Sequence, residues 1–267
     1  MFQQPTLPPT LTDPGVWLFT QERVLAWMLA LARVSGLLGA LPGFGPERIP
    51  NELRVVLGVA LATIMAPVLP PLHAQGWGLF DMLFALTAEL AVGLILGTLI
   101  SWILEGVAFA GTLMDTQMGF SFVQIVDPTN ANPTSVSGLI LGQVGLLLFF
   151  ATGLHHLAIQ ALHESWRIAP PGQLPPLHPM PFIVFLGHLL MRGFMLAFPI
   201  LAVLFLLDLG LGIAGKFMPQ LQLLQLSFPA KIVLGFLLLT FTVRELVVWL
   251  RPLMEEVLRI FPKAIGS

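Results

Sequence analysis

The stretch from Thr129 to His163 contains no Asp, Glu, Lys or Arg, and it constrains the fold more than any other feature of the sequence. An amphipathic helix on the surface of a soluble protein shows a polar face every 3.6 residues, and this stretch shows none. About 20 apolar residues are enough for a helix to cross a membrane. The stretch therefore indicates helices that lie in lipid or against other protein.

This charge-free stretch contains one of six apolar segments, each a candidate for a membrane-spanning helix. The segments cover residues 17–42, 53–72, 78–114, 134–163, 180–215 and 217–250. Prolines such as Pro67, Pro199 and Pro229 lie inside them, and each removes a helical hydrogen bond. Within a membrane, such breaks persist only where protein or a water-filled cavity receives the freed backbone groups. The pattern predicts an all-α, polytopic membrane-type protein of long, kinked helices.

Composition agrees with this fold class. The 267 residues include only 12 basic and 14 acidic side chains, and 56% are hydrophobic. Mean hydropathy is +0.89. Charged residues are 10% of the chain, whereas about 25% is usual for a soluble domain. The net charge of −2 gives no basic surface for nucleic acid, and the absence of cysteine excludes disulfides and thiolate metal sites.

One glycine pattern matches a nucleotide-binding motif. Gly210, Gly212 and Gly215 have the spacing G-x-G-x-x-G. That motif requires a preceding strand and an acidic residue about 20 positions later. Here the preceding run is helical, and residues 232–243 contain no acid. We expect these glycines to let helices approach closely.

Three histidines, His155, His156 and His163, suggest a metal site at first sight. His156 and His163 are two helical turns apart, about 10 Å along the axis, which is too far for one ion. We therefore expect structural or interfacial histidines. No catalytic triad, zinc motif or phosphate-binding loop is present, so the sequence predicts no enzyme, no catalytic residue, no metal site and no cofactor.

A row of small and acidic residues runs along the third segment. Glu89, Gly93, Gly97, Ser101 and Glu105 follow at four-residue steps and so lie on one line of a helix. Small residues in such a row accept a neighbouring helix at short distance. The two carboxylates need partners at membrane depth. The cations considered on this chain are Arg192, Lys216 and Lys231.

The same segment ends in a polar and flexible run, residues 114–122. Its members are Met114, Asp115, Thr116, Gln117, Met118, Gly119, Phe120, Ser121 and Phe122. Methionine side chains are flexible and fill irregular gaps, and glycine permits backbone bends. Composition leaves two interpretations open, a buried helix end or a deformable constriction.

Five ordered motifs extend over nearly the whole chain. They are Ala32-Arg33 with Pro42-Gly43-Phe44-Gly45, Pro50 and Arg54; Glu89, Gly93 and Gly97; Asp115 to Gly119 with Asp127-Pro128; Gly153-Leu154-His155 with Ser165; and Asp208-Leu209-Gly210 with Pro219-Gln220, Phe228-Pro229 and Lys231. In this order they resemble the FliR family of flagellar export-gate proteins, which has counterparts in injectisome type III secretion.

The resemblance implies a fold and a role without catalysis. It implies a FliP-like helical part, residues 1–180, followed by a FliQ-like helical hairpin and C-terminal helix, residues 181–267. It implies assembly with several copies of FliP and FliQ, and with FlhB, into the pore that unfolded export substrates enter. Residues 114–122 would be the plug of that pore, which favours the constriction interpretation.

The four-residue row, the glycine pattern and the family motifs together indicate where helices or subunits meet. These positions are Glu89, Gly93, Gly97, Ser101, Glu105, Asp208, Gly212, Lys216, Pro219, Gln220 and Lys231. An injectisome homologue is one alternative. A secondary transporter is another, although Asp208 and Lys216, its only plausible ion-site pair, are eight residues apart and would not touch on a helix.

The expected location is the bacterial inner membrane, in the flagellar basal body. Four cations near the end of the chain, Arg244, Arg251, Arg259 and Lys263, favour a cytoplasmic C-terminus. Glu255 lies midway between Arg251 and Arg259, so these three residues form an i, i+4, i+8 row of alternating charge.

Overall fold

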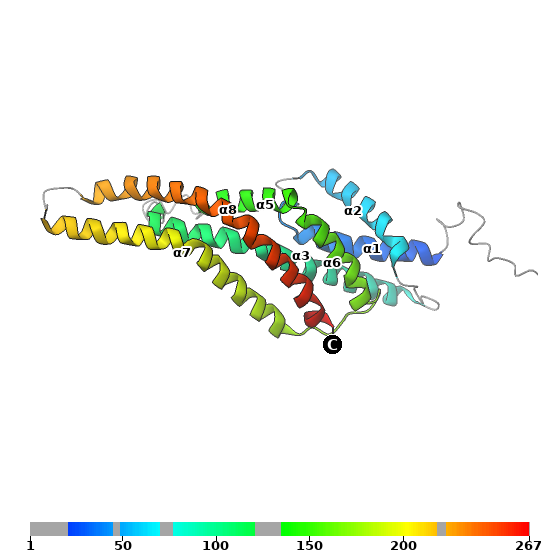
Figure 1. The fold of residues 1–267 in the computed structure, drawn as a ribbon. Helices are drawn as coiled ribbons and strands as arrows, with labels where there is room; N and C mark the ends of the chain where they lie inside the picture. The colour runs from blue at the N-terminus through cyan, green and yellow to red at the C-terminus, as the bar shows by residue number, and fades with distance from the viewer. Residues whose placement is uncertain (1–20, 45–48, 70–76, 121–134, 218–222, 267) are drawn as a thin grey trace, which may run out of the picture. The chain divides into compact units, whose positions relative to one another are not determined.

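Helices are the only regular elements in the described part of this computed structural model, residues 21–44, 49–69, 77–120, 135–217 and 223–266 (Figure 1). They are α1 (Gln21–Ala40), α2 (Asn51–Met65), the short 3₁₀ helix η3 (Ala66–Val68), α3 (Leu79–Met118), α5 (Val136–Ala151), α6 (Leu154–Ile168), α7 (Pro179–Phe217) and α8 (Leu223–Ile265). By length and composition, α1, α3, α7 and α8 can each cross a membrane, and the bent pair α5–α6 can be a fifth span. The all-α, polytopic membrane-type fold is confirmed.

Three segments differ from their expected ranges. Helix α2 has only 15 residues and gives way to η3, in which Pro67 lies. The charge-free stretch forms two helices bent by 71° rather than one, because Gly153 lies between them with a φ of +75°. A positive φ is easy for glycine and ends a helix. Helix α8 continues past residue 250 to Ile265.

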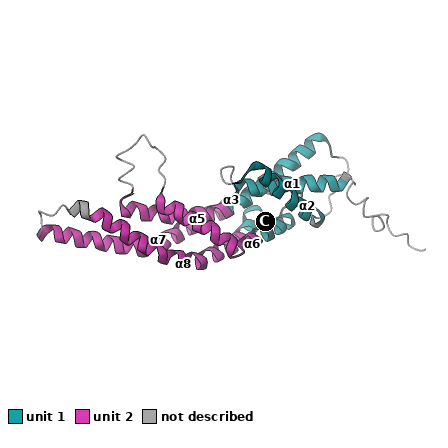
Figure 2. Cartoon of the chain, turned by 90° about the horizontal axis from the view of Figure 1, so that it is seen from above, with its two compact units in different colours: residues 1–99, 158–177, 261–267 teal, residues 100–157, 178–260 magenta. Residues whose placement is uncertain are grey.

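The contacts within the chain divide it into two compact units (Figure 2). Unit 1 consists of residues 1–99, 158–177 and 261–267, and unit 2 of residues 100–157 and 178–260. Helices α3, α6 and α8 each contribute residues to both units. The expected division near residue 180 falls beside the start of α7 at Pro179.

In unit 1, α1 lies directly on the first half of α3. A Cβ atom added at Gly93 would overlap the carbonyl oxygen of Arg33. At Gly97 it would lie 2.6 Å from the carbonyl oxygen of Leu37 and 2.8 Å from Cβ of Ala40. The two backbones therefore touch along the glycine row of α3, an approach that only small residues allow.

In unit 2, the second half of α3 packs against α5 and α7 through glycines as well. A Cβ at Gly111 would lie 2.5 Å from Cα of Gly138, and a Cβ at Gly193 would lie 2.9 Å from the carbonyl oxygen of Gly106. Helices α7 and α8 run side by side in both ribbon views (Figures 1 and 2). The indole N–H of Trp249 donates to the carbonyl oxygen of Arg192 at 3.3 Å and ties these two helices.

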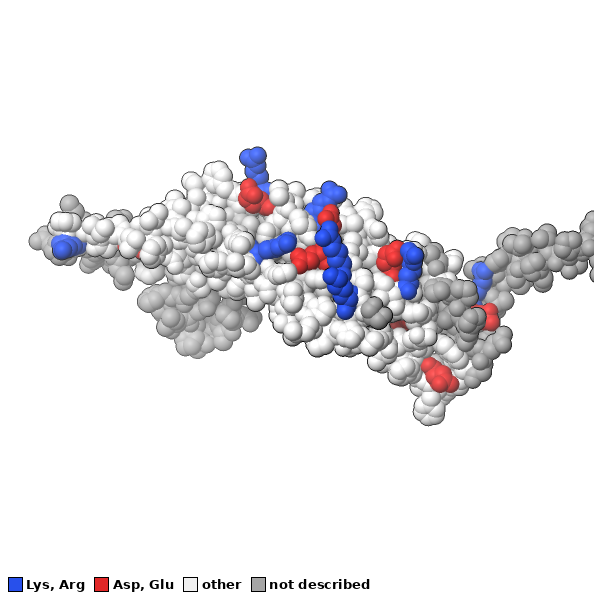
Figure 3. Space-filling model, turned by 60° about the horizontal axis from the view of Figure 1, so that its bottom comes forward, with Lys and Arg blue, Asp and Glu red and all other residues white. Residues whose placement is uncertain are grey.

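Much of the apolar surface stays uncovered within the chain. In the most apolar window of α7 only 22% of residues are buried, and the same is true of α8. Phe205, Leu206, Phe241 and Val248 are each more than half exposed. Figure 3 shows a face on which charged side chains are few and scattered among uncharged ones. Such a surface requires lipid or other protein around it.

The contact between α1 and α3 makes Gly93 a sensitive position. We expect Gly93→Ala to reduce stability by about 1–3 kcal/mol, because the added methyl must push two backbones apart. Thermal unfolding of the purified protein in detergent measures this loss.

Gly39→Ala is the matched control, since a Cβ at Gly39 meets no atom within 4 Å. That substitution should leave stability unchanged or raise it slightly, because alanine is the better helix former. Equal stability of the two variants would contradict the close contact.

Candidate functional site

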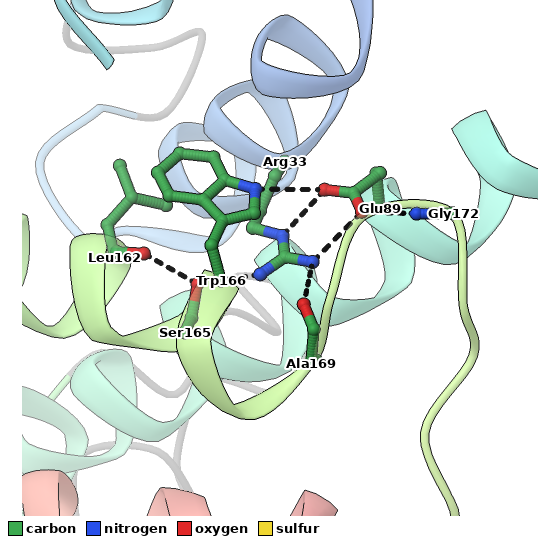
Figure 4. Close-up of polar contacts among 7 residues, drawn as sticks. All are labelled: Arg33, Glu89, Leu162, Ser165, Trp166, Ala169 and Gly172. Atoms are coloured by element: carbon green, nitrogen blue, oxygen red, sulfur yellow. Dashed lines mark hydrogen bonds and ion pairs between the residues drawn. The ribbon is translucent and has the colours of Figure 1, made fainter. Parts of the chain in front are cut away.

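A buried ion pair ties α1 to α3 in unit 1 (Figure 4). Arg33 donates from Nε to Glu89 Oε2 at 2.7 Å and from Nη2 to Glu89 Oε1 at 2.9 Å. Neither side chain has any exposed surface. The two parallel hydrogen bonds are the bidentate arrangement that guanidinium and carboxylate groups favour.

The remaining donors and acceptors of this pair are also satisfied. Arg33 donates to the hydroxyl oxygen of Ser165 and to the carbonyl oxygen of Ala169, both at 2.9 Å. Glu89 accepts from the indole N–H of Trp166 at 3.3 Å and from the backbone N–H of Gly172 at 3.1 Å. The pair thus fixes α6 and the turn after it against α1 and α3.

The partners considered for Glu89 from the sequence were wrong. Arg192 pairs with Glu256 at 3.4 Å, and Lys231 pairs with Asp208 at 2.6 Å. Arg33 was missed, although it is the lone charge in the apolar run from Val24 to Gly45. A lone buried cation and a lone buried anion on two apolar helices are strong candidates to meet.

The other members of the row on α3 lie near or beyond the boundary of unit 1. Ser101 is half-buried. Glu105 is exposed, and within the described residues it has no hydrogen-bond or ion-pair partner. Lys216 is likewise exposed and unpaired within the described part of α7.

The end of α3 forms a second polar site, in unit 2. Asp115 is 4% exposed and accepts from the Ser135 hydroxyl at 2.7 Å and from the Ser137 backbone N–H at 3.1 Å. Ser135 caps α5 by accepting from the backbone N–H of Gly138. The carboxylate therefore lies at the N-terminus of α5, where the helix dipole favours negative charge.

The residues around Asp115 are packed against α5 and α8. Met114 and Met118 are fully buried, and a Cβ at Gly235 of α8 would collide with the Met118 side chain. Gly119 has a φ of +91°, and a Cβ there would lie 2.6 Å from the Phe228 ring. In this conformation Thr116, Gln117, Gly119 and Phe120 are the described residues of 114–122 that are not fully buried and so are left to line a constriction.

A third cluster joins the end of α3 to α7 and α8. Gln117 donates from Nε2 to Asp208 Oδ2 at 3.1 Å, and Lys231 Nζ lies 2.6 Å from Asp208 Oδ1. The side chain of Lys231 is 15% exposed and that of Asp208 is 36% exposed. Asp208 therefore pairs with Lys231, 23 positions away, rather than with Lys216 on its own helix.

Several predicted positions lie elsewhere. Gly210 and Gly212 face open space in the described structure, with no atom within 4 Å of an added Cβ, so this chain makes no close helix contact there. Phe122, Pro219 and Gln220 lie outside the described residues. Among the described residues no three His, Asp or Glu side chains gather as metal ligands would.

These observations together define a polytopic helical membrane protein with buried polar ties between helices and large uncovered apolar faces. The model of the family "Bacterial export proteins, family 1" matches residues 24–257, and the chain belongs to this family.

Curated relatives carry one name, "Flagellar biosynthetic protein FliR". The protein of Caulobacter vibrioides is 27% identical over 248 residues, which is 91% of this chain and 98% of the relative. The protein of Bacillus subtilis is 29% identical over 80% of this chain and 84% of its own length. The protein of Escherichia coli is 26% identical over 93% of this chain and 97% of its own length.

The buried ion pair yields a direct prediction. We expect Arg33→Met to destabilise the protein by about 3–5 kcal/mol, because it leaves Glu89 buried without a counter-charge. The double variant Arg33→Met/Glu89→Met should regain much of that loss. Thermal unfolding in detergent measures both.

Arg167→Met is the control, since Arg167 pairs with Glu164 on the exposed surface of α6 at 3.3 Å. An exposed pair contributes about 0–1 kcal/mol, so this variant should resemble the wild type. If Arg33→Met were equally mild, the pair would not hold unit 1 together.

Proposed function

We propose that this chain is a non-enzymatic subunit of the flagellar type III protein export gate. In that role it forms, with several copies of FliP and FliQ, the pore that unfolded export substrates enter during flagellum assembly. The family match and the flagellar names of the relatives support this role. The flagellar names also favour the flagellar branch over the injectisome.

The observation that most supports assembly with other subunits is the uncovered apolar surface of α7 and α8. Two long apolar helices with only 22% of their most apolar windows buried must be covered by neighbours. Gly210 and Gly212 of α7 add open small-residue positions, where another helix can approach closely. FliP, FliQ and FlhB are the proposed neighbours, with lipid on the remaining surface.

The chain is proposed to consist of two consecutive parts. Residues 1–180 are the FliP-like part, and residues 181–267 are the FliQ-like hairpin and C-terminal helix. The start of α7 at Pro179 and the side-by-side course of α7 and α8 support this division (Figure 1). The proposed location is the inner membrane, in the flagellar basal body, with the C-terminus in the cytoplasm because α8 carries four cations from Arg244 onward.

The plug of this pore is the proposed role of residues 114–122. A pore for unfolded chains must not select one sequence, so its seal should deform rather than recognise. A glycine with positive φ suits such a seal, and Asp115 fixes the base of the segment at α5. Thr116, Gln117 and Phe120 are the described side chains that can face the pore.

The uncovered helices predict behaviour in isolation. We expect the chain purified alone in mild detergent to aggregate, and to become monodisperse when FliP and FliQ are produced with it. Size-exclusion chromatography with mass measurement of the complex reads this directly. A stable monomer with no affinity for either partner would contradict the proposed assembly.

A proline at the plug tests its role. Gly119→Pro removes the Gly119 N–H that donates to the Asp115 carbonyl at 3.1 Å, and it cannot adopt a φ of +91°. We expect altered ion leakage and reduced export, measured as membrane ion permeability and as swimming motility.

The matched control is Val136→Pro at the first position of α5. Ser135 before it is already extended, with φ −62° and ψ +117°, which suits a residue preceding proline. Normal motility and unchanged leakage in Gly119→Pro would count against the plug.

A further inference from the structure

Three side chains from three helices of unit 2 meet beside the proposed plug. Gln117 is the penultimate residue of α3, Asp208 belongs to α7 and Lys231 to α8. The Asp208 carboxylate uses one oxygen for Gln117 at 3.1 Å and the other for Lys231 at 2.6 Å. We call these three residues the latch.

The contacts of the latch can break more easily than those that Asp115 makes with Ser135 and Ser137. Asp115 is almost fully buried and holds two donors at the start of α5, so breaking it would strand a buried charge. Asp208 is 36% exposed, and it keeps Lys231 as a partner when Gln117 leaves. Gln117 itself carries no charge, so its departure leaves no ion unpaired.

Lys231 of the latch lies on the same face of α8 as two residues that make apolar contacts with the proposed plug. Phe228 and Gly235 lie three residues before and four residues after Lys231, on the same side of α8. Phe228 contacts Gly119, and Gly235 contacts Met118. Gln117 therefore binds Asp208 of α7, while the next two residues, Met118 and Gly119, contact α8.

We propose that the hydrogen bond from Gln117 to Asp208 is the releasable closure of the export pore, with Asp208–Lys231 as its permanent base. This inference rests on the proposed function above and deepens it by naming the contact that regulates the plug. Gln117 and Asp208 are positioning residues. In the closed state they hold Gln117 on α7 beside the apolar contacts of Met118 and Gly119 with α8, and passage of a chain parts neutral contacts without breaking an ion pair.

Gln117→Met tests the latch, because it keeps the length of the side chain and removes its amide donor. Loss of a hydrogen bond to a charged group should raise the fraction of open pores at least tenfold, which corresponds to about 1.4 kcal/mol. The readout is ion permeability of cells producing the complete export gate, measured with no substrate in transit. Co-purification with FliP and FliQ should stay normal.

Gln160→Met is the matched control, since Gln160 is exposed on α6 and has no partner among the described residues. It should leave permeability at the wild-type level. Asp208→Asn probes the base of the latch: it strands Lys231, which is only 15% exposed, and should lower the yield of the assembled complex.

Moving one methylene from the side chain of residue 117 to that of residue 208 distinguishes loss of the hydrogen bond from general structural damage. Gln117→Asn keeps the amide but is one methylene shorter, so it should leak. Adding Asp208→Glu restores the missing methylene from the other side, and the double variant should be tighter than Gln117→Asn alone. A double variant as leaky as the single one would overturn the latch.

Two further outcomes for Gln117→Met also overturn the latch: wild-type permeability in an assembled complex, or loss of assembly. Neither removes the proposed function, which fails separately if a strain lacking this chain exports flagellar proteins normally. Increased permeability with normal assembly, together with tighter closure in the Gln117→Asn/Asp208→Glu double variant, supports the latch.

Discussion

The buried pair between Arg33 and Glu89 is the interaction on which unit 1 depends. An ion pair with no exposed surface is costly to desolvate, and it persists here because each nitrogen and oxygen atom of the two charged groups has a hydrogen-bond partner. Those partners come from α6 and the following turn, far along the sequence from α1 and α3. The pair therefore converts apolar contact, which has no preferred direction, into one fixed arrangement of helices. The glycine row on α3 supports the same arrangement, since the two backbones nearly touch at Gly93, about one helical turn from Glu89.

Unit 2 also fixes the arrangement of its helices with glycine contacts and buried polar side chains. Its glycine contacts bring α3 against α5 and α7, and its polar ties gather at the end of α3 rather than in mid-helix. The Asp115 carboxylate at the start of α5 is stabilised by the Ser137 backbone N–H, the Ser135 hydroxyl and the helix dipole, so it needs no cation. The second carboxylate, Asp208, has a cation and some solvent. One buried and one partly exposed carboxylate, Asp115 and Asp208, thus bind the end of α3, and they differ in the free energy that breaking their contacts would cost.

Hydropathy alone predicted the helical class, because long apolar runs have few other stable forms in a membrane. It also placed the glycine row, since a four-residue step is a property of one helix. The polar partners were harder to predict. Arg33 with Glu89 and Asp208 with Lys231 join different helices, and such pairs depend on crossing angles and rotations that no local period encodes. The bend at Gly153 was missed for a related reason: glycine within an apolar run is compatible with a straight helix, and only tertiary contacts decide.

The chain has 25 glycines among its 267 residues, and several of them are explained by the same close packing of helices. Helices in an apolar environment gain little from hydrophobic contact with one another, so they rely on close packing and a few hydrogen bonds. Close packing needs small residues, and the hydrogen bonds need polar side chains where helices cross. In this chain both requirements are met at Gly93 beside Arg33 and at Gly235 beside Lys231. Where a glycine faces open space instead, as at Gly212, no described atom of this chain supplies such a contact, and the position leaves room for another backbone at the same short distance.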